Sequence, residues 1–93
     1  AAKAGLIGFT IALAQEGAKI GITVNVVCPG YIDTEMVRAV PEKVLDSIIA
    51  TIPVGRLGKA EEIASMCGYL ASNEAAFING ATMTVNGSQY IAG

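Results

Sequence analysis

The chain has 93 residues, of which 53% are hydrophobic and 15% charged, and its formal net charge is −2. It contains no histidine and only two cysteines, Cys28 and Cys67, which excludes a Cys/His zinc site and a Cys-His nucleophile. The six basic residues are spread singly along the sequence, a pattern that excludes the basic patch with which proteins contact nucleic acid.

The apolar content is high for so short a chain. Ordinary soluble domains are roughly 45–50% apolar, and a chain of this size buries only about 60–65% of its unfolded surface. A membrane span needs ~18 apolar residues in a row, whereas Gln15, Glu16 and Lys19 interrupt the most apolar stretch. The excess therefore predicts burial against further protein. The two unpaired cysteines favour a reduced, cytoplasmic environment.

Residues 4–18 are predicted to form a helix. Apolar residues recur at three- and four-residue spacing on one face: Ile7, Ile11, Ala14 and Ala18. A second apolar set lies on another side: Leu6, Phe9 and Leu13. The helix is therefore apolar nearly all round and is expected to be buried. A strip of small residues that suits close contact with another helix or subunit is made of Gly5, Gly8 and Ala12.

The next segments alternate between strand and helix patterns. Residues 22–28 are rich in β-branched residues and nearly all apolar, which predicts a strand covered on both faces and ended by Pro29-Gly30. Residues 34–40 and 42–51 are predicted to form two short helices split by Pro41. An amphipathic helix is predicted over residues 59–72, and its core face is expected to hold Ile63, Met66 and Leu70.

A second strand is predicted over residues 81–85, between turns at residues 79–80 and 86–87. The order helix, strand, helices, strand is that of the last portion of a doubly wound α/β fold. Two strands alone do not make such a sheet. Residues 1–93 are therefore expected to be the C-terminal fragment of one α/β domain. The chain is expected to start inside a helix, because no cap residue precedes its first helical residues.

Three segments together resemble the short-chain dehydrogenase/reductase family. Residues 1–5 read AAKAG and resemble the tail of the family's Tyr-x-x-x-Lys helix. Residues 25–34 read NVVCPGYIDT and are similar to its strand and Pro-Gly loop beneath the nicotinamide. Residues 52–64, 78–80 and 84–87 are similar to its C-terminal segment. This resemblance covers essentially the whole chain and implies a Rossmann-type doubly wound parallel sheet whose N-terminal part is absent from it.

The resemblance implies an NAD(P)H-dependent reductase of 3-oxoacyl thioesters. Residues 49–54 and 85–90 lean toward the reductases that convert acetoacetyl-CoA to 3-hydroxybutyryl-CoA in polyhydroxybutyrate synthesis, and the alternative is a 3-oxoacyl-ACP reductase of fatty acid synthesis. Pro41 stands where some such reductases carry a basic residue, and Ser88 stands where a second glycine is usual. The resemblance further implies NADP(H) in preference to NAD(H), and a cytoplasmic tetramer.

The residues that carry the family's chemistry are then Lys3 and the loop after the first strand. Lys3 is the expected catalytic lysine, which lowers the pKa of the proton-donating tyrosine and holds the nicotinamide ribose. That tyrosine would fall two positions before Ala1. Cofactor binding is also implied for four loop residues: Pro29, Gly30, Ile32 through its backbone, and Thr34, which is also a good helix N-cap.

Substrate contacts are implied for Gly30, Tyr31 and Met36. The alternative for Tyr31 is an aromatic residue that only packs, and the alternative for Met36 is ordinary core packing. Asp33 and Glu35 are expected to be solvated, because alternate residues at a helix start do not converge. No metal site is predicted.

A second hypothesis is a remnant without activity that offers the strip of the first helix and the strand 81–85 as an association surface. The chain by itself is expected to be inactive under either hypothesis, because the proton donor and the glycine-rich phosphate loop lie outside its residues.

Overall fold

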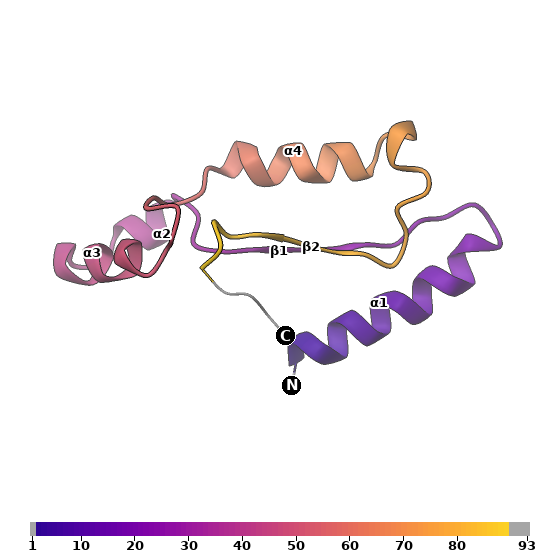
Figure 1. Ribbon diagram of the computed structural model, residues 1–93, viewed down its shortest axis with the longest axis horizontal. Coiled ribbons are helices and arrows are strands. Elements are labelled where there is room, and N and C mark those ends of the chain that lie inside the picture. The colour runs from indigo at the N-terminus through magenta and orange to yellow at the C-terminus, as the bar shows by residue number, and fades with distance from the viewer. Residues whose placement is uncertain (1, 90–93) are drawn as a thin grey trace. The chain divides into compact units, whose positions relative to one another are not determined.

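The computed structural model describes residues 2–89, apart from the side chains of residues 2 and 3. Figure 1 shows the helices and the two strands along the chain. Their bounds are α1 Ala2–Ala18, β1 Val26–Pro29, α2 Glu35–Arg38, α3 Glu42–Ala50, α4 Ala60–Leu70, the 3₁₀ turn η1 Asn73–Ala75, and β2 Thr82–Val85.

The chain forms two compact units. The first unit comprises Ala1–Val27 and Ser65–Met83, and the second comprises Cys28–Ala64 and Thr84–Gly93. The strand pair and helix α4 therefore contribute residues to both units. None of the helices that the structure describes has the length and apolar character needed to cross a membrane.

Strands β1 and β2 form a parallel pair. Val26 N–H donates to Ala81 C=O and Gly30 N–H donates to Val85 C=O, each at 2.9 Å, so the register is the same at both ends of the strands. Helices α2, α3 and α4 lie between the two strands in sequence, as expected when parallel strands are joined by a crossover connection. The structure confirms the predicted α/β class.

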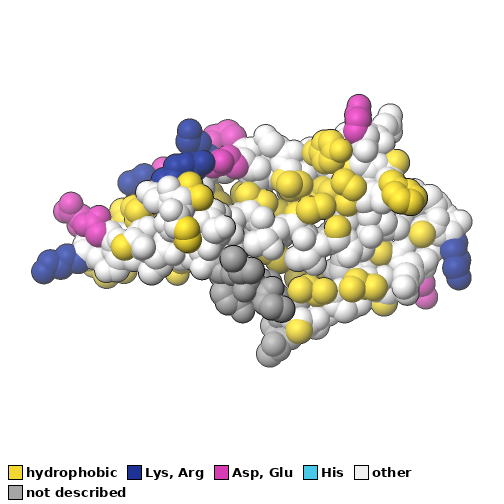
Figure 2. All heavy atoms as spheres, viewed as in Figure 1, with side chains coloured by type: hydrophobic (Ala, Val, Ile, Leu, Met, Phe, Trp, Pro, Cys, Tyr) yellow, Lys and Arg dark blue, Asp and Glu magenta, His cyan; other side chains and the backbone are white. Residues whose placement is uncertain are grey.

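Helix α1 confirms the helix predicted over residues 4–18, but not its burial. Only Thr10 and Ala14 are buried among its described side chains. Leu6 and Phe9 are 48% and 64% exposed, and Figure 2 shows apolar side chains at the surface along this helix. Within the first unit, Gly80 and Asn79 approach α1 on its Ala14 side. The burial of its other faces, predicted to be against further protein, stays a prediction.

The predicted strand over residues 22–28 starts only at Val26, because asparagine side chains take the earlier hydrogen bonds. Val24 N–H donates to Asn79 Oδ1 at 2.9 Å. The amide of Asn25 donates to Ile78 C=O at 3.1 Å and accepts from Ala81 N–H at 2.9 Å. We call these contacts of Asn25 and Asn79 the amide latch. They join the two chain segments just ahead of β1 and β2.

Helices α2, α3 and α4 confirm the three remaining predicted helices, each shorter by one to three residues at its ends. Thr34 caps α2 by accepting a hydrogen bond from Val37 N–H at 3.3 Å, and Pro41 starts α3 as its N-cap residue. The predicted core face of α4 is confirmed in pattern, since Ile63, Met66 and Leu70 are half-buried and the other residues of the helix are exposed.

Candidate cofactor loop and adjoining cleft

The loop after β1 is held against the end of β2 by a close backbone approach. Gly30 N–H donates to Val85 C=O at 2.9 Å. A Cβ on Gly30 would lie 2.6 Å from Asn86 Cβ and 2.9 Å from Asn86 Cα, closer than real side chains come. Glycine at this position is therefore required by contact within the protein. The sequence interpretation, which assigned the missing Cβ to the approach of a flat ring, did not include this cause.

Residues 31–33, which follow Gly30, pair with Gly58. Gly58 N–H donates to Tyr31 C=O at 2.9 Å, and Asp33 N–H donates to Gly58 C=O at 2.8 Å. Together these bonds form a parallel bridge between Ile32 and Gly58. In such a bridge the N–H of Ile32 points away from Gly58, because the flanking residues supply the bonds. The backbone of Ile32 is thus fixed, and its own donor faces the opposite side.

Thr34 and Asp33 complete the loop. The Thr34 Oγ1 accepts from Val37 N–H, so its own hydroxyl proton remains a donor. Asp33 accepts from the Arg38 guanidinium at 2.6 and 3.0 Å, and this hydrogen bond holds the pKa of the Asp33 carboxyl below its usual value. Asp33 is exposed, as expected, but it is ion-paired, which the sequence interpretation missed.

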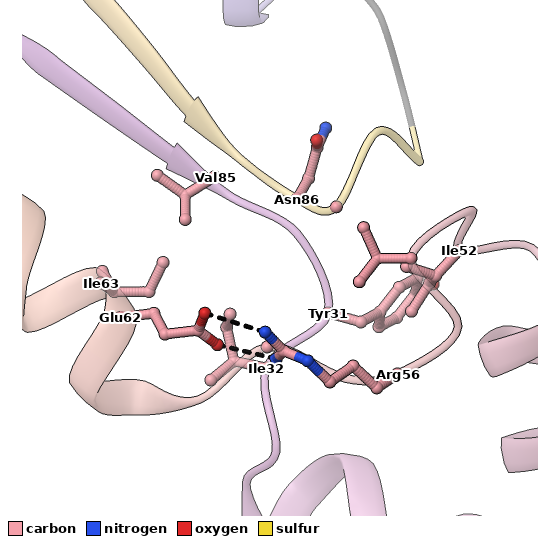
Figure 3. A pocket seen from close by; sticks show the side chains of 11 residues that line it. Tyr31, Ile32, Ile52, Arg56, Glu62, Ile63, Val85 and Asn86 are labelled. Carbon is pink, nitrogen blue, oxygen red and sulfur yellow. Dashed lines mark hydrogen bonds and ion pairs between the residues drawn. The ribbon is translucent and has the colours of Figure 1, made fainter.

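A cleft of about 210 Å³ lies beside this loop within the second unit (Figure 3). Apolar side chains of Ile52, Val54, Ile63 and Val85 line it, and Arg56 and Glu62 stand at its polar edge. Of the residues predicted for the site, Tyr31 and Ile32 line the cleft. Its remaining walls come from segments to which the sequence interpretation gave no site role.

Arg56 and Glu62 face each other in Figure 3 and form a bidentate ion pair, with Nη1–Oε1 at 2.8 Å and Nη2–Oε2 at 3.0 Å. Glu62 Oε1 also accepts from Lys59 N–H at 2.8 Å, and Arg56 Nη1 donates to Leu57 C=O at 3.0 Å. The Arg56 hydrogen bond, followed by that of the Lys59 N–H, lowers the pKa of Glu62 to about 2.

The position of Glu62 shows which signal could have revealed this network. Lys59 precedes the first residue of α4, so Glu62 is the third residue of the helix, where a glutamate can reach back to the N-cap amide. The sequence interpretation used Glu62 only as a favourable charge at the helix start. No spacing rule would have revealed Arg56, which belongs to an irregular loop.

The segment after β2 closes another wall of the cleft. Gly87 has φ +61°, and its C=O accepts from Val54 N–H at 3.3 Å. A Cβ on Gly87 would lie 3.1 Å from side-chain atoms of both Ile52 and Val54. Ser88, which stands where the family usually has a glycine, has φ +68°, a left-handed conformation that favours glycine. The structure thus supplies a physical reason for glycine at that position.

The other predicted site residues lie elsewhere in the fold. Lys3 belongs to α1 in the first unit, and its side chain lies outside the described parts of the structure. Met36 projects from α2 with 83% of its surface exposed and does not line the cleft. Core packing, the alternative expected for Met36, is not seen among the residues that the structure describes. Pro29, at the end of β1, is exposed.

Comparison with known proteins identifies the family. Residues 1–88 match the family profile described as Enoyl-(Acyl carrier protein) reductase. The chain belongs to the short-chain dehydrogenase/reductase family. Within it, the chain is 66% identical over 91 residues to an acetoacetyl-CoA reductase of Shinella zoogloeoides, a match that covers 97% of this chain and 38% of the relative.

Other relatives of this short-chain dehydrogenase/reductase show a similar coverage. An acetoacetyl-CoA reductase of Rhizobium meliloti is 66% identical over 93 residues, covering 99% of this chain and 39% of the relative. A 3-oxoacyl-[acyl-carrier-protein] reductase of Pseudomonas aeruginosa is 55% identical over 92 residues, covering 99% and 37%. The chain therefore spans less than two fifths of the length of these curated relatives.

Proposed function

We propose that this chain is the C-terminal part of an NAD(P)H-dependent reductase that converts acetoacetyl-CoA to 3-hydroxybutyryl-CoA. The observation that carries the proposal is the 66% identity, over nearly the whole chain, to two proteins named acetoacetyl-CoA reductase. The family profile is described by an enoyl reductase activity, but relatives at 55–66% identity bear the names of 3-oxoacyl reductases. Their names favour reduction of a ketone over reduction of a double bond.

The loop from Pro29 to Thr34 fits a nicotinamide dinucleotide. The N–H of Ile32 faces away from the Gly58 bridge and can donate to the carboxamide oxygen of the nicotinamide. The hydroxyl of Thr34 keeps a proton to donate to the carboxamide or to a phosphate oxygen. Pro29 and Gly30 present backbone without a bulky side chain beneath the ring. When bound, the cofactor supplies the hydride, and NADP(H) is proposed in preference to NAD(H).

Lys3 is proposed to act on the proton side of the reaction. Its ammonium group, next to a tyrosine supplied from outside these residues, would stabilise the phenolate and so lower the pKa of that tyrosine. The tyrosine could then donate a proton to the ketone oxygen near neutral pH. The same ammonium would hydrogen-bond the nicotinamide ribose. Lys3 therefore has both a catalytic and a cofactor-positioning role in the proposal.

Substrate contacts are proposed for Gly30, Tyr31 and Met36. Tyr31 is 44% exposed and lies in the cofactor loop, and Met36 is an exposed apolar side chain in α2, two residues after the end of the loop. An acyl thioester offers an apolar chain and a carbonyl, and these two side chains could cover such a chain. A cytoplasmic homotetramer is the proposed assembly.

The complete protein that contains these residues provides the test. We expect it to oxidise NADPH with acetoacetyl-CoA, and we expect Lys3→Ala to lower kcat by about 10²–10⁴-fold, the usual range for loss of acid-base assistance. Lys19→Ala is the matched control, because Lys19 is an exposed lysine just beyond the same helix. Equal activity of the Lys3 and Lys19 variants would remove Lys3 from the mechanism. A complete protein inactive on every 3-oxoacyl thioester would overturn the proposed function.

A second candidate substrate is the acyl-carrier-protein thioester, favoured by the 55% identity to the Pseudomonas aeruginosa reductase. Comparing kcat/KM for acetoacetyl-CoA with that for acetoacetyl-acyl-carrier protein decides between the carriers. A higher value for the CoA ester supports the proposal. A higher value for the carrier-protein ester would replace it with the second candidate.

A further inference from the structure

We propose that the Arg56–Glu62 ion pair is a positioning device for the cofactor loop, acting through Gly58 on the backbone of Ile32. The inference rests on the proposed function, because it assigns the loop from Pro29 to Thr34 to the nicotinamide. Neither Arg56 nor Glu62 would touch the cofactor. Their role would be to keep the N–H of Ile32 in the orientation that binding requires.

Glu62 fixes the segment on both sides of Gly58. Its carboxylate accepts two hydrogen bonds from Arg56, at 2.8 and 3.0 Å, and one from Lys59 N–H, at 2.8 Å. Arg56 also donates to the C=O of Leu57 at 3.0 Å. Gly58 therefore lies between two residues that are tied to one carboxylate at the start of a regular helix.

The position of Gly58 in turn determines the position of the loop. It exchanges backbone hydrogen bonds with Tyr31 and Asp33, at 2.9 and 2.8 Å. Contact is also tight, since a Cβ on Gly58 would lie 2.8 Å from Ile32 Cδ1. A shift of Gly58 must therefore move Tyr31, Ile32 and Asp33 or break their bonds. Ile32, Arg56 and Glu62 line the same cleft (Figure 3).

The effect of the Arg56–Glu62 pair on the loop is expected to be small. Both side chains of the pair are about half exposed, at 50% for Arg56 and 40% for Glu62, so solvent screens their attraction. Loss of such a pair changes an equilibrium by about two- to fivefold. The pair therefore favours the binding orientation of the loop but is not required for folding. The chemical step would stay intact when the pair is removed.

The test uses the complete reductase with Glu62→Gln and, as a matched control, Glu61→Gln. Both variants remove one negative charge from the first turn of α4, but only Glu62 has the Arg56 and Lys59 contacts. We expect Glu62→Gln to raise the KM for NADPH about two- to fivefold while kcat stays within about twofold. Arg56→Lys, which keeps the charge and loses the bidentate geometry, should lie between wild type and Glu62→Gln.

Amide hydrogen exchange supplies a readout that does not depend on activity. In Glu62→Gln the amides of Gly58 and Asp33 should exchange about two- to fivefold faster, while that of Val26, bonded to Ala81 in the first unit, should not change. Unchanged exchange at Gly58 and Asp33, or an equal rise at Val26, would overturn the inference. So would an unchanged KM for NADPH in an active enzyme. If the wild-type protein shows no reductase activity, the proposed function fails, and the exchange measurement still decides whether the pair holds the loop.

Discussion

The two units differ in the kind of polar contact that each contains. In the first unit the amide latch of Asn25 and Asn79 joins segments far apart in sequence through neutral hydrogen bonds. Within the part of the chain that the structure describes, both ion pairs, Asp33–Arg38 and Arg56–Glu62, belong to the second unit. Neutral amides do not titrate and are little affected by salt, whereas exposed ion pairs respond to both. The unit that carries the proposed cofactor loop is therefore the one that solution conditions can adjust.

The largest expected effect comes from Gly30→Ala in the second unit. Because the new methyl group would lie 2.6 Å from Asn86 Cβ and 2.9 Å from its Cα, backbone must move, and we expect the free energy of unfolding to fall by about 3 kcal/mol. Gly68→Ala in helix α4 is the control, since nothing lies within 4 Å of its added methyl group and alanine favours a helix by about 1 kcal/mol. Urea unfolding measures both. Equal changes of the same sign would show that the Gly30–Asn86 contact is not limiting.

A smaller loss is expected from Asn25→Ala in the first unit. It removes both hydrogen bonds of the Asn25 side chain and leaves the half-buried Ala81 N–H and Ile78 C=O without that partner. We expect the free energy of unfolding to fall by about 2 kcal/mol. This loss should be independent of pH between about 2 and 7, because no group in the latch titrates there. Asn73→Ala, at an exposed position, should have little effect, and a similar loss in both variants would contradict the role of the latch.

The smallest expected effect is a difference between the two units in how they respond to pH. Arg56 and the Lys59 N–H lower the pKa of Glu62 from 4.5 to about 2, so its favourable contribution is complete above pH 4.5 and is lost as the pH falls toward 2. The amide of Gly58 should lose protection over that range before that of Val26 does. Carboxyl NMR titration should give Glu62 a pKa of about 2, which returns toward 4.5 in Arg56→Met. An unchanged Glu62 pKa in that variant would mean that Arg56 does not hold the carboxylate.

Local sequence patterns predicted most of the fold. The helices confirm the predicted segments within a few residues, since apolar spacing, Pro41 and the Thr34 cap act on the backbone close to their own positions. Strand starts were less predictable. Val24 and Asn25 lie in the segment predicted as a strand, but the side chains of Asn79 and Asn25, brought together across the fold, take the hydrogen bonds that a ladder would use.

For the candidate site, too, some features follow from the sequence and others only from the tertiary structure. The sequence by itself determined the family motifs, and these motifs give the positions proposed for the cofactor loop, Pro29–Thr34, and for Lys3, because they are read from neighbouring residues. Only the tertiary structure decided why residue 30 must be glycine, that Gly58 bridges Ile32, and that Arg56 pairs with Glu62. Each of these three facts is a contact between segments that meet only after folding. No pattern of adjacent residues encodes such a contact, because it depends on where the chain returns in space.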